Sequence, residues 1–386
     1  MSDEVGNRVA EIPGIYGTVS ISERVIQRIW AQQDFIQREL RTRCGKTLLI
    51  KHPGRWNRAE EGPDFKEAVL EIDGKSVVGD VEIHFYAHDW ERHGHRDDPH
   101  FEAVRLHVIL FEPSQEILSH MPALVLGPYL KEDLESYLLA QSVRGDVAHL
   151  FEDWSDKPAS SIRRDLCEGA ALRWEQKVAF ARKRLESQGF EEAVHGMTLE
   201  VLGYRRNRAT MADVAHQFPH SIWRESPPQA EQVMSASRRP WVRSGLRPAN
   251  FPEKRLDQYR QIWTSKPDWI ERLRLFDWPT LCLDTLPEIG AYRRQAKLTS
   301  IRKRLLEVID SAVGGTRLDT LVIDAWLPLI SAERSVDLKD LWFAWYPGDF
   351  PENFSKALSF HAVANGKSYP HANVWNQGLL QRVFTR

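Results

Sequence analysis

Apolar residues near the N-terminus recur at roughly the spacing of an amphipathic helix. Between Ile21 and Thr42 they occupy Val25, Ile26, Ile29, Trp30, Ile36 and Leu40. This spacing places them on one helical face, and Ser20 or Ser22 can cap the first turn. The pattern predicts a helix over residues 21–42 that packs against a core.

The pattern then changes to the two-residue alternation that is typical of strands. Three such runs are KTLLIKH from Lys46, DFKEAVLEID from Asp64 and SVVGDVEIHFYA from Ser76. The last two are joined by Asp73-Gly74, a dipeptide that favours a hairpin turn. An antiparallel meander is the simplest arrangement of the three. The runs AVRLHVILFE from Ala103 and ALVLG from Ala123 predict two further strands.

Past Leu130 the chain contains long helix-forming stretches, such as the one that begins SSIRRDLC at Ser160. This change predicts two domains, residues 1–127 and residues 128–386. We expect an α/β fold: an N-terminal mixed sheet with flanking helices, followed by a mostly α-helical C-terminal domain.

Composition limits the class of protein. The chain has 386 residues, of which 42% are hydrophobic, and no run approaches the roughly 18 apolar residues of a membrane span. The N-terminus lacks the basic start and apolar stretch of a signal peptide. The three cysteines, Cys44, Cys167 and Cys282, form neither a disulfide framework nor a CxxC zinc site. We therefore expect a soluble cytoplasmic protein that is not inserted in a membrane.

Charge and histidine are unevenly distributed. Residues 1–125 hold 15 Lys and Arg against 21 Asp and Glu, whereas the rest of the chain holds 37 against 33. Six of the 14 histidines lie between His84 and His107. The acidic part of the chain is therefore also where imidazoles gather, which favours a metal site.

Three ionisable side chains share one face of the predicted strand from Ser76. The two-residue period places Asp80, Glu82 and His84 on one side, opposite Val81 and Ile83. Two carboxylates that close repel each other unless a cation offsets their charge. The pattern therefore predicts a divalent ion against this face.

Asp64 adds a further carboxylate, from the neighbouring strand. Pro63 and Gly62 fix where it enters that strand. If the strands pair through Asp73-Gly74, Asp64 lies at about the height of Glu82. Two carboxylates on adjacent strands suit Mg²⁺ or Mn²⁺, and Zn²⁺ less well. We expect Asp64, Glu82 and Asp80 to be the metal ligands.

The order helix, meander, Pro63-Asp64 and Glu82-Ile83-His84 resembles the PD-(D/E)XK nuclease superfamily. The resemblance implies that Asp64 and Glu82 bind Mg²⁺ and that Asp80 is an auxiliary acid. It also implies hydrolysis of phosphodiester bonds in DNA or RNA. His84 stands where the superfamily has lysine, so it is the group expected to orient water, and Lys66 is a candidate for a displaced lysine.

A second resemblance extends over nearly the whole chain. Ordered blocks are similar to a bacterial family catalogued as domain of unknown function 2851. They are Gly62-Pro63-Asp64-Phe65, Val81-Glu82-Ile83-His84, Asp89-Trp90, His93-Gly94-His95, Leu106-His107-Val108, Leu202-Gly203-Tyr204 with Asn207, Asn250-Phe251-Pro252 with Arg255, and Gln377-Gly378. The resemblance implies a shared fold and no particular activity.

The histidine-rich stretch HDWERHGHRDDPH leaves three hypotheses open. His88, His93 and His95 line the cleft of Asp64 and Glu82, where they contact phosphate or transfer protons. Alternatively, His93 and His95 bind a separate Zn²⁺ and the protein is a metallohydrolase for a small substrate. The third hypothesis is a polar surface loop held by histidine hydrogen bonds.

Basic clusters in the C-terminal half are candidates for contact with nucleic acid. We expect Arg205, Arg206, Arg247 and Arg255 to grip the phosphate backbone. Solvated helix faces are the alternative explanation of such clusters. A nuclease-like module that binds nucleic acid or assembles without cleaving remains the alternative to an Mg²⁺- or Mn²⁺-dependent nuclease. The chain has no GxGxxG, GxxxxGK[ST] or GxSxG motif, which disfavours nucleotide-driven and serine-hydrolase chemistry.

Overall fold

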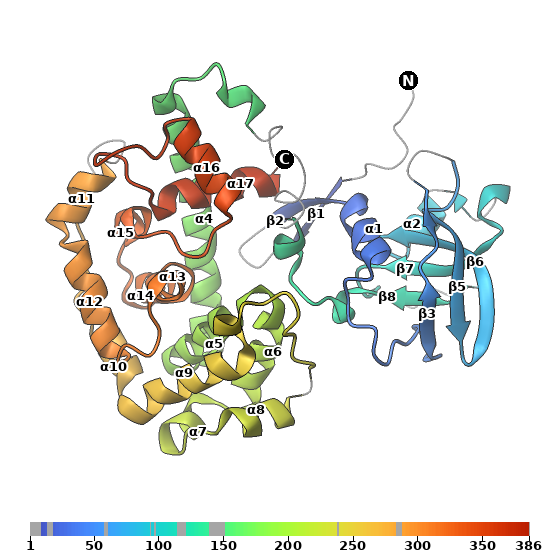
Figure 1. The fold of residues 1–386 in the computed structure, drawn as a ribbon, viewed down its shortest axis with the longest axis horizontal. Helices are drawn as coiled ribbons and strands as arrows, with labels where there is room; N and C mark the ends of the chain where they lie inside the picture. Colours follow the sequence, from blue (N-terminus) through green and yellow to red (C-terminus); the bar gives the residue numbers. More distant parts are fainter. Residues whose placement is uncertain are drawn as a thin grey trace. The chain divides into compact units, whose positions relative to one another are not determined.

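The computed structural model describes residues 9–13, 18–57, 61–92, 94–95, 98–113, 121–138, 151–237, 239–282 and 288–385. These residues form two compact units that divide between Asp133 and Leu134. The first is an α/β unit and the second is helical (Figure 1). The predicted order of an α/β part followed by a mostly helical part is confirmed. The predicted boundary after residue 127 lies shortly before the observed division.

A mixed sheet forms the centre of the α/β unit (Figure 1). Its strands lie in the order β3 (Leu48–His52), β5 (Phe65–Ile72), β6 (Lys75–His84), β7 (Val104–Ile109) and β8 (Ala123–Val125), and β4 (Arg55–Trp56) also pairs with β5. The first three are antiparallel, as the meander predicted, and β6, β7 and β8 are parallel. Asp73 and Gly74 both have positive φ, 49° and 75°, which is the conformation of a tight hairpin turn.

The first helix is shorter than its apolar pattern predicted. Helix α1 spans Glu23–Gln32 and packs against β6. It ends because Gln33 adopts a left-handed conformation with φ 51°. The chain then turns back, and the Phe35 ring stacks on Trp30 with centroids 5.8 Å apart. Apolar residues beyond Gln32 therefore serve the core from a loop, and the expected helix over residues 21–42 is wrong in its second half.

Two further features complete the description of this unit. An antiparallel pair of strands, β1 (Val9–Pro13) and β2 (Thr18–Ser22), was not predicted. The connection from β6 to β7 contains the short helix α2 (Asp89–Arg92) and the 3₁₀ turn η2 (Pro99–Phe101). Gly79 allows this connection to return closely, because a Cβ there would lie 2.7 Å from the carbonyl oxygen of Ala103.

The helical unit is built around the 30-residue helix α4 (Ala159–Gln188), along which α17 (Asn373–Thr385) packs. Gly378 permits the close crossing, since a Cβ there would lie 2.1 Å from the Leu166 carbonyl oxygen. Further helices among the described residues are α5 (Phe190–Leu202), α6 (Tyr204–Gln217), α7 (His220–Glu225), α8 (Ala230–Ala236), α9 (Pro252–Ser265), α10 (Trp269–Arg274), α11 (Ile289–Gln295), α12 (Leu298–Val308), α13 (Gly315–Leu321), α14 (Leu327–Arg334), α15 (Lys339–Ala344) and α16 (Glu352–Phe360).

A π-helical turn (Val322–Trp326) joins α13 to α14, and 3₁₀ turns lie at Gly127–Tyr129, Glu152–Trp154 and Pro248–Asn250. Large aromatic side chains fill the core of the helical unit, among them the fully buried Trp223, Trp269, Trp326, Trp342 and Trp375. Within the described part of the chain, none of the helices has the length and apolar character of a membrane span.

Candidate metal centre

A β-bulge determines which side chains face each other between β5 and β6. If the pairing next to the hairpin turn continued along both strands, Asp64 would lie opposite Ile83. The pairing instead shifts by one residue at the bulge that contains Glu67. Glu67 has a positive φ of 60°, and its N–H donates to the Asp80 carboxylate at 3.0 Å. The shift brings Asp64 opposite Glu82. Asp80 therefore holds the bulge.

Backbone N–H groups link Asp64 to the Glu82 side chain and to the neighbouring Ile83. The Asp64 N–H donates to Oε2 of Glu82 at 2.9 Å, and the Ile83 N–H donates to Oδ2 of Asp64 at 3.0 Å. From helix α1, Nε2 of Gln27 donates to Oδ1 of Asp64 at 2.7 Å. Both oxygens of Asp64 thus accept hydrogen bonds within the fold, which orients this carboxylate and the Glu82 side chain.

The other oxygen of Glu82 faces two imidazoles. Oε1 lies 3.4 Å from Nε2 of His84 and 3.4 Å from Nε2 of His95. The three residues offer ligand atoms that all lie within 4.8 Å of one another, and they are the only such group of His, Cys, Asp and Glu in the described ranges. The separations of 3.4 Å exceed the usual N–H···O length of about 2.7–3.2 Å. Two ligands bound to one tetrahedral ion at about 2.1 Å are about 3.4 Å apart, so the two separations from Glu82 fit a shared metal ion.

His84 is oriented by a second buried histidine. Its Nδ1 lies 2.9 Å from Nε2 of His107 on β7, and both side chains are buried. Burial, and then the charge of His95, lower the pKa of His107 to about 4, so this ring is neutral at pH 7. A neutral His107 can accept the Nδ1 proton of His84. That tautomer leaves the Nε2 lone pair of His84 facing Glu82, as in metal sites whose histidines are held by an outer partner.

Aromatic rings fix His95 in place. Its ring stacks on Phe101 of η2 at a centroid distance of 3.8 Å and on His84 at 5.3 Å. Trp90 of α2 meets His95 edge-on at 5.5 Å and also contacts His107 at 5.4 Å. The β6–β7 connection therefore covers the sheet face that carries Glu82 and His84. The alternation of β6 predicted an open cleft wall there, and instead these two side chains are only 6% and 1% exposed.

The other predicted residues of this unit lie outside the group of three. Asp80 is bonded at the bulge, and Lys66 lies opposite Arg55 of β4. His88 is exposed, with its ring stacked on Tyr86 at 5.4 Å. His93 falls outside the described residues.

Two of the four arginines predicted to grip nucleic acid are engaged within the helical unit. Nη1 of Arg206 donates to the Ser244 carbonyl at 3.1 Å. Arg255 is buried and donates to the side chains of Asn250 and Gln258. Arg247 is exposed, and the side chain of Arg205 is outside the described part of the chain.

Sequence reasoning divided this group between two hypotheses. Glu82 and His84 were assigned to a carboxylate site, whereas His95 was placed either in the cleft of that site or at a separate Zn²⁺. The imidazole density signalled the region, but the convergence of His95 on Glu82 depends on the tertiary packing of the connection. The contribution of Gln27 carried no recognisable sequence signal.

Comparison with known proteins gives one match. The sequence model of the family described as Protein of unknown function (DUF2851) matches residues 23–236, which is more than half of the chain and contains the whole candidate metal centre. Searches of curated proteins and of solved structures found no match.

Proposed function

We propose a function for this chain, which belongs to the DUF2851 family: it is a metal-dependent nuclease that hydrolyses phosphodiester bonds in DNA or RNA. The proposal rests on one observation above the others. Oε1 of Glu82 stands 3.4 Å from each of two imidazole nitrogens, a spacing that suits a shared ion better than direct hydrogen bonds.

The donor set favours particular metals. Two imidazoles with one carboxylate suit Mn²⁺ or Zn²⁺ better than Mg²⁺, which prefers oxygen ligands. The sequence alone favoured Mg²⁺ or Mn²⁺ bound by Asp64, Glu82 and Asp80, and we now propose Glu82, His84 and His95 as the ligands. Three protein ligands are typical of catalytic sites, where the remaining positions accept water and substrate. The ion supplies Lewis-acid polarisation of a phosphoryl oxygen.

The chain's own residues prepare this site. Asp64, held by Gln27 and the Ile83 N–H, orients Glu82 through its own N–H. His107 fixes the ring of His84. Because these supports lie on helix α1, on strands β6 and β7 and directly before β5, the ligands are arranged before any substrate binds.

The choice of a phosphodiester substrate rests on the resemblance to PD-(D/E)XK nucleases. The order of α1, the β3-β5-β6 meander, the β6–β7 connection and parallel β7 supports it. Asp64 directly precedes β5, and Glu82 and His84 lie near the end of β6, as the motif implies. The chain departs from the pattern in having only short helical segments in the connection and a histidine in place of the lysine.

A nuclease assay with labelled DNA and RNA, supplied in turn with Mn²⁺, Zn²⁺ or Mg²⁺, tests the proposal. We expect cleavage by the wild type and a loss of at least about 100-fold in Glu82→Gln, because the carboxylate ligand contributes several kcal/mol through the ion. Glu67→Gln is the matched control, since it makes the same change on an exposed side chain of β5. Equal activity in the two variants, or no cleavage by the wild type with any of the metals, rejects the proposal.

The burial of Glu82 and His84 supports a second candidate function. In this alternative the ion is structural, holds the β6–β7 connection on the sheet, and the protein binds nucleic acid without cleaving it. An ion that raises the melting temperature of the wild type but not of Glu82→Gln, without any cleavage, would favour this alternative.

A further inference from the structure

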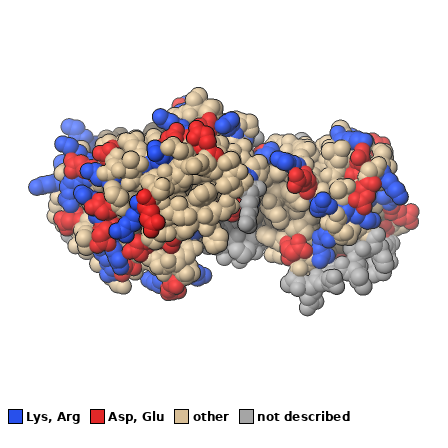
Figure 2. All heavy atoms as spheres, turned by 90° about the horizontal axis from the view of Figure 1, so that it is seen from below, with Lys and Arg blue, Asp and Glu red and all other residues tan. Residues whose placement is uncertain are grey.

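A strongly basic segment forms the corner between α11 and α12. Six Lys and Arg residues lie within residues 293–304, and no acidic residue occurs between Ile289 and Leu306. Lys297 forms the corner itself, with a left-handed φ of 50°. Figure 2 shows Lys and Arg atoms, with some acidic atoms among them, at the left edge of the helical unit, the side on which α11 and α12 lie in Figure 1.

Two of these cations are used inside the unit. Arg293 donates to the carbonyls of Ala344, Trp345 and His371. Arg302 donates to both carboxylate oxygens of Asp319 at 2.8 and 3.1 Å.

Four cations of the segment remain exposed and make no ion pair within the described ranges: Arg294, Lys297, Lys303 and Arg304. Arg304 lies over the Phe276 ring, 4.6 Å from its centroid. These four residues, which we call the α11–α12 surface, differ from Arg206 and Arg255 because their charges are available to a partner.

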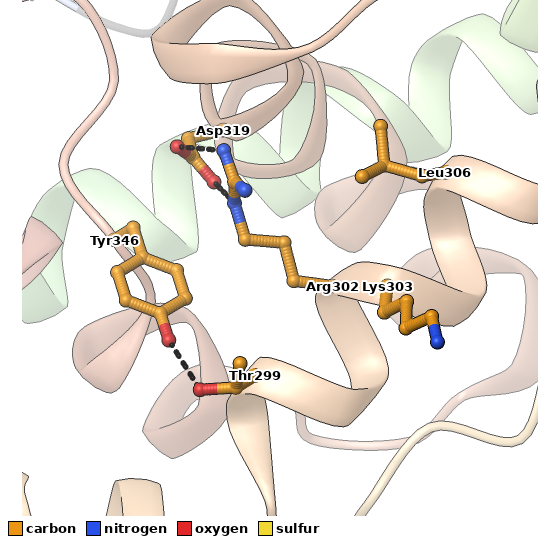
Figure 3. A pocket seen from close by; sticks show the side chains of 6 residues that line it. All are labelled: Thr299, Arg302, Lys303, Leu306, Asp319 and Tyr346. Carbon is orange, nitrogen blue, oxygen red and sulfur yellow. Dashed lines mark hydrogen bonds and ion pairs between the residues drawn. The ribbon is translucent and has the colours of Figure 1, made fainter. Parts of the chain in front are cut away.

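A hollow of about 430 Å³ adjoins this surface (Figure 3). Its lining consists of Thr299, Arg302, Lys303, Leu306, Asp319 and Tyr346. The hydroxyls of Thr299 and Tyr346 lie 3.1 Å apart, and the charge of Arg302 is offset by Asp319. Lys303 is therefore the uncompensated charge of the lining.

We propose that the α11–α12 surface binds the phosphate backbone of a single nucleic-acid strand, with one nucleotide seated in the hollow. Four unpaired cations can replace counterions along such a backbone. The volume is within the range of small-ligand pockets, about 300–1,000 Å³, and a strand has protruding units that can fill it, whereas a planar lipid surface leaves it empty. The further claim that the bound strand is also the substrate rests on the proposed nuclease function.

Binding of a fluorescent 20-nucleotide DNA strand, measured by anisotropy in EDTA over a range of salt concentrations, tests this surface. The test variant combines Arg294→Ala, Lys297→Ala and Lys303→Ala. Its matched control combines Arg224→Ala, Lys254→Ala and Lys183→Ala, three exposed cations on α7, α9 and α4 of the same unit. Loss of three phosphate contacts makes the negative slope of log K against log salt shallower by about 2. At 0.1 M salt this corresponds to an affinity about 100-fold weaker.

We expect this loss in the test variant and wild-type binding in the control. Equal weakening of both variants, no weakening of either, or binding to vesicles with anionic lipid in place of the strand overturns the proposal. Binding is measured without metal, so its outcome is separate from cleavage. If the strand binds the wild type as expected but is never cleaved, the binding proposal for this surface stands and the proposed nuclease activity is rejected.

Discussion

The two units each contain a buried histidine whose surroundings differ. His195 of the helical unit contacts the Tyr259 hydroxyl at 2.6 Å through Nδ1 and the Phe218 carbonyl at 3.0 Å through Nε2. His84 of the α/β unit contacts His107 at 2.9 Å through Nδ1, but its Nε2 faces Glu82 at 3.4 Å. Protein atoms at normal hydrogen-bond lengths account for the environment of His195. The separation of 3.4 Å between His84 and Glu82 is longer than such bonds and equals the spacing expected for two ligands of one ion.

Ion pairs with one buried member show the same contrast. Arg317 and Asp349 of the helical unit are 2.7 Å apart, and Arg302 and Asp319 are 2.8 Å apart. Such direct pairs stabilise the fold without a further ligand. The contrast shows that buried charge by itself does not identify a functional site, and that the separation between the groups is the more useful criterion.

The largest expected effect comes from opening one of the direct pairs. Asp349→Ala leaves the buried Arg317 side chain without its carboxylate, which is itself 30% exposed. Because water reaches Asp349, the loss is smaller than for a fully buried pair, and we expect about 2–3 kcal/mol in the free energy of unfolding from urea denaturation. Asp257→Ala, at an exposed aspartate of α9, is the control. A loss as small as that of the control would mean that the pair is not structural.

A smaller effect is expected from the pH dependence of His195. Burial lowers the pKa of His195 to about 4, from 6.5 in the unfolded chain. Because the unfolded state binds the proton more readily, the stabilisation is present above pH 6.5 and is lost as the pH falls toward 4. From pH 7 to pH 5 this amounts to about 2 kcal/mol.

The measurement is urea unfolding at both pH values. Between pH 7 and pH 5 we expect His195→Gln, whose side chain stays neutral, to lose about 2 kcal/mol less stability than the wild type. His216→Gln, at an exposed position of α6, should behave as the wild type. If His195→Gln loses as much stability as the wild type, the buried ring is not the source of the acid sensitivity.

The smallest expected effect concerns the outer partner of the metal centre. His107→Phe fills the same space but removes the contact that orients His84. Loss of such a partner weakens metal affinity by about 10–100-fold, so we expect at least about 1.4 kcal/mol. A competition titration with a fluorescent chelator measures it, with the exposed His100→Ala as control. Unchanged affinity in His107→Phe would show that His107 does not support a ligand.

Part of the fold followed from the sequence. The meander and its Asp73-Gly74 turn were predicted because strand alternation and turn chemistry are local properties. The end of α1 was not, since the apolar pattern continues past Gln32 while the chain turns at Gln33. The bulge at Glu67 was also missed, because no local pattern marks a residue with positive φ that is held by Asp80 on the next strand.

The sequence predicted which stretch of the chain contains the candidate site, but not which residues form it. The paired positions of Asp64 and Glu82 and the density of histidines were visible in the sequence. Which imidazole reaches Glu82 depends on how Phe101 and Trp90 pack the β6–β7 connection, which is a tertiary property. Similarly, a run of arginines does not reveal which side chains are bonded internally, as Arg206 and Arg255 are.

The most direct test of the metal centre is crystallographic. Crystals grown with Mn²⁺ or Zn²⁺ and measured at the absorption edge of the metal give an anomalous difference map that locates the ion. We predict one peak at about 2.0–2.2 Å from Oε1 of Glu82 and from Nε2 of both His84 and His95. No peak at saturating metal, or a peak bound elsewhere while these three side chains keep their positions, would contradict a metal ion at this centre.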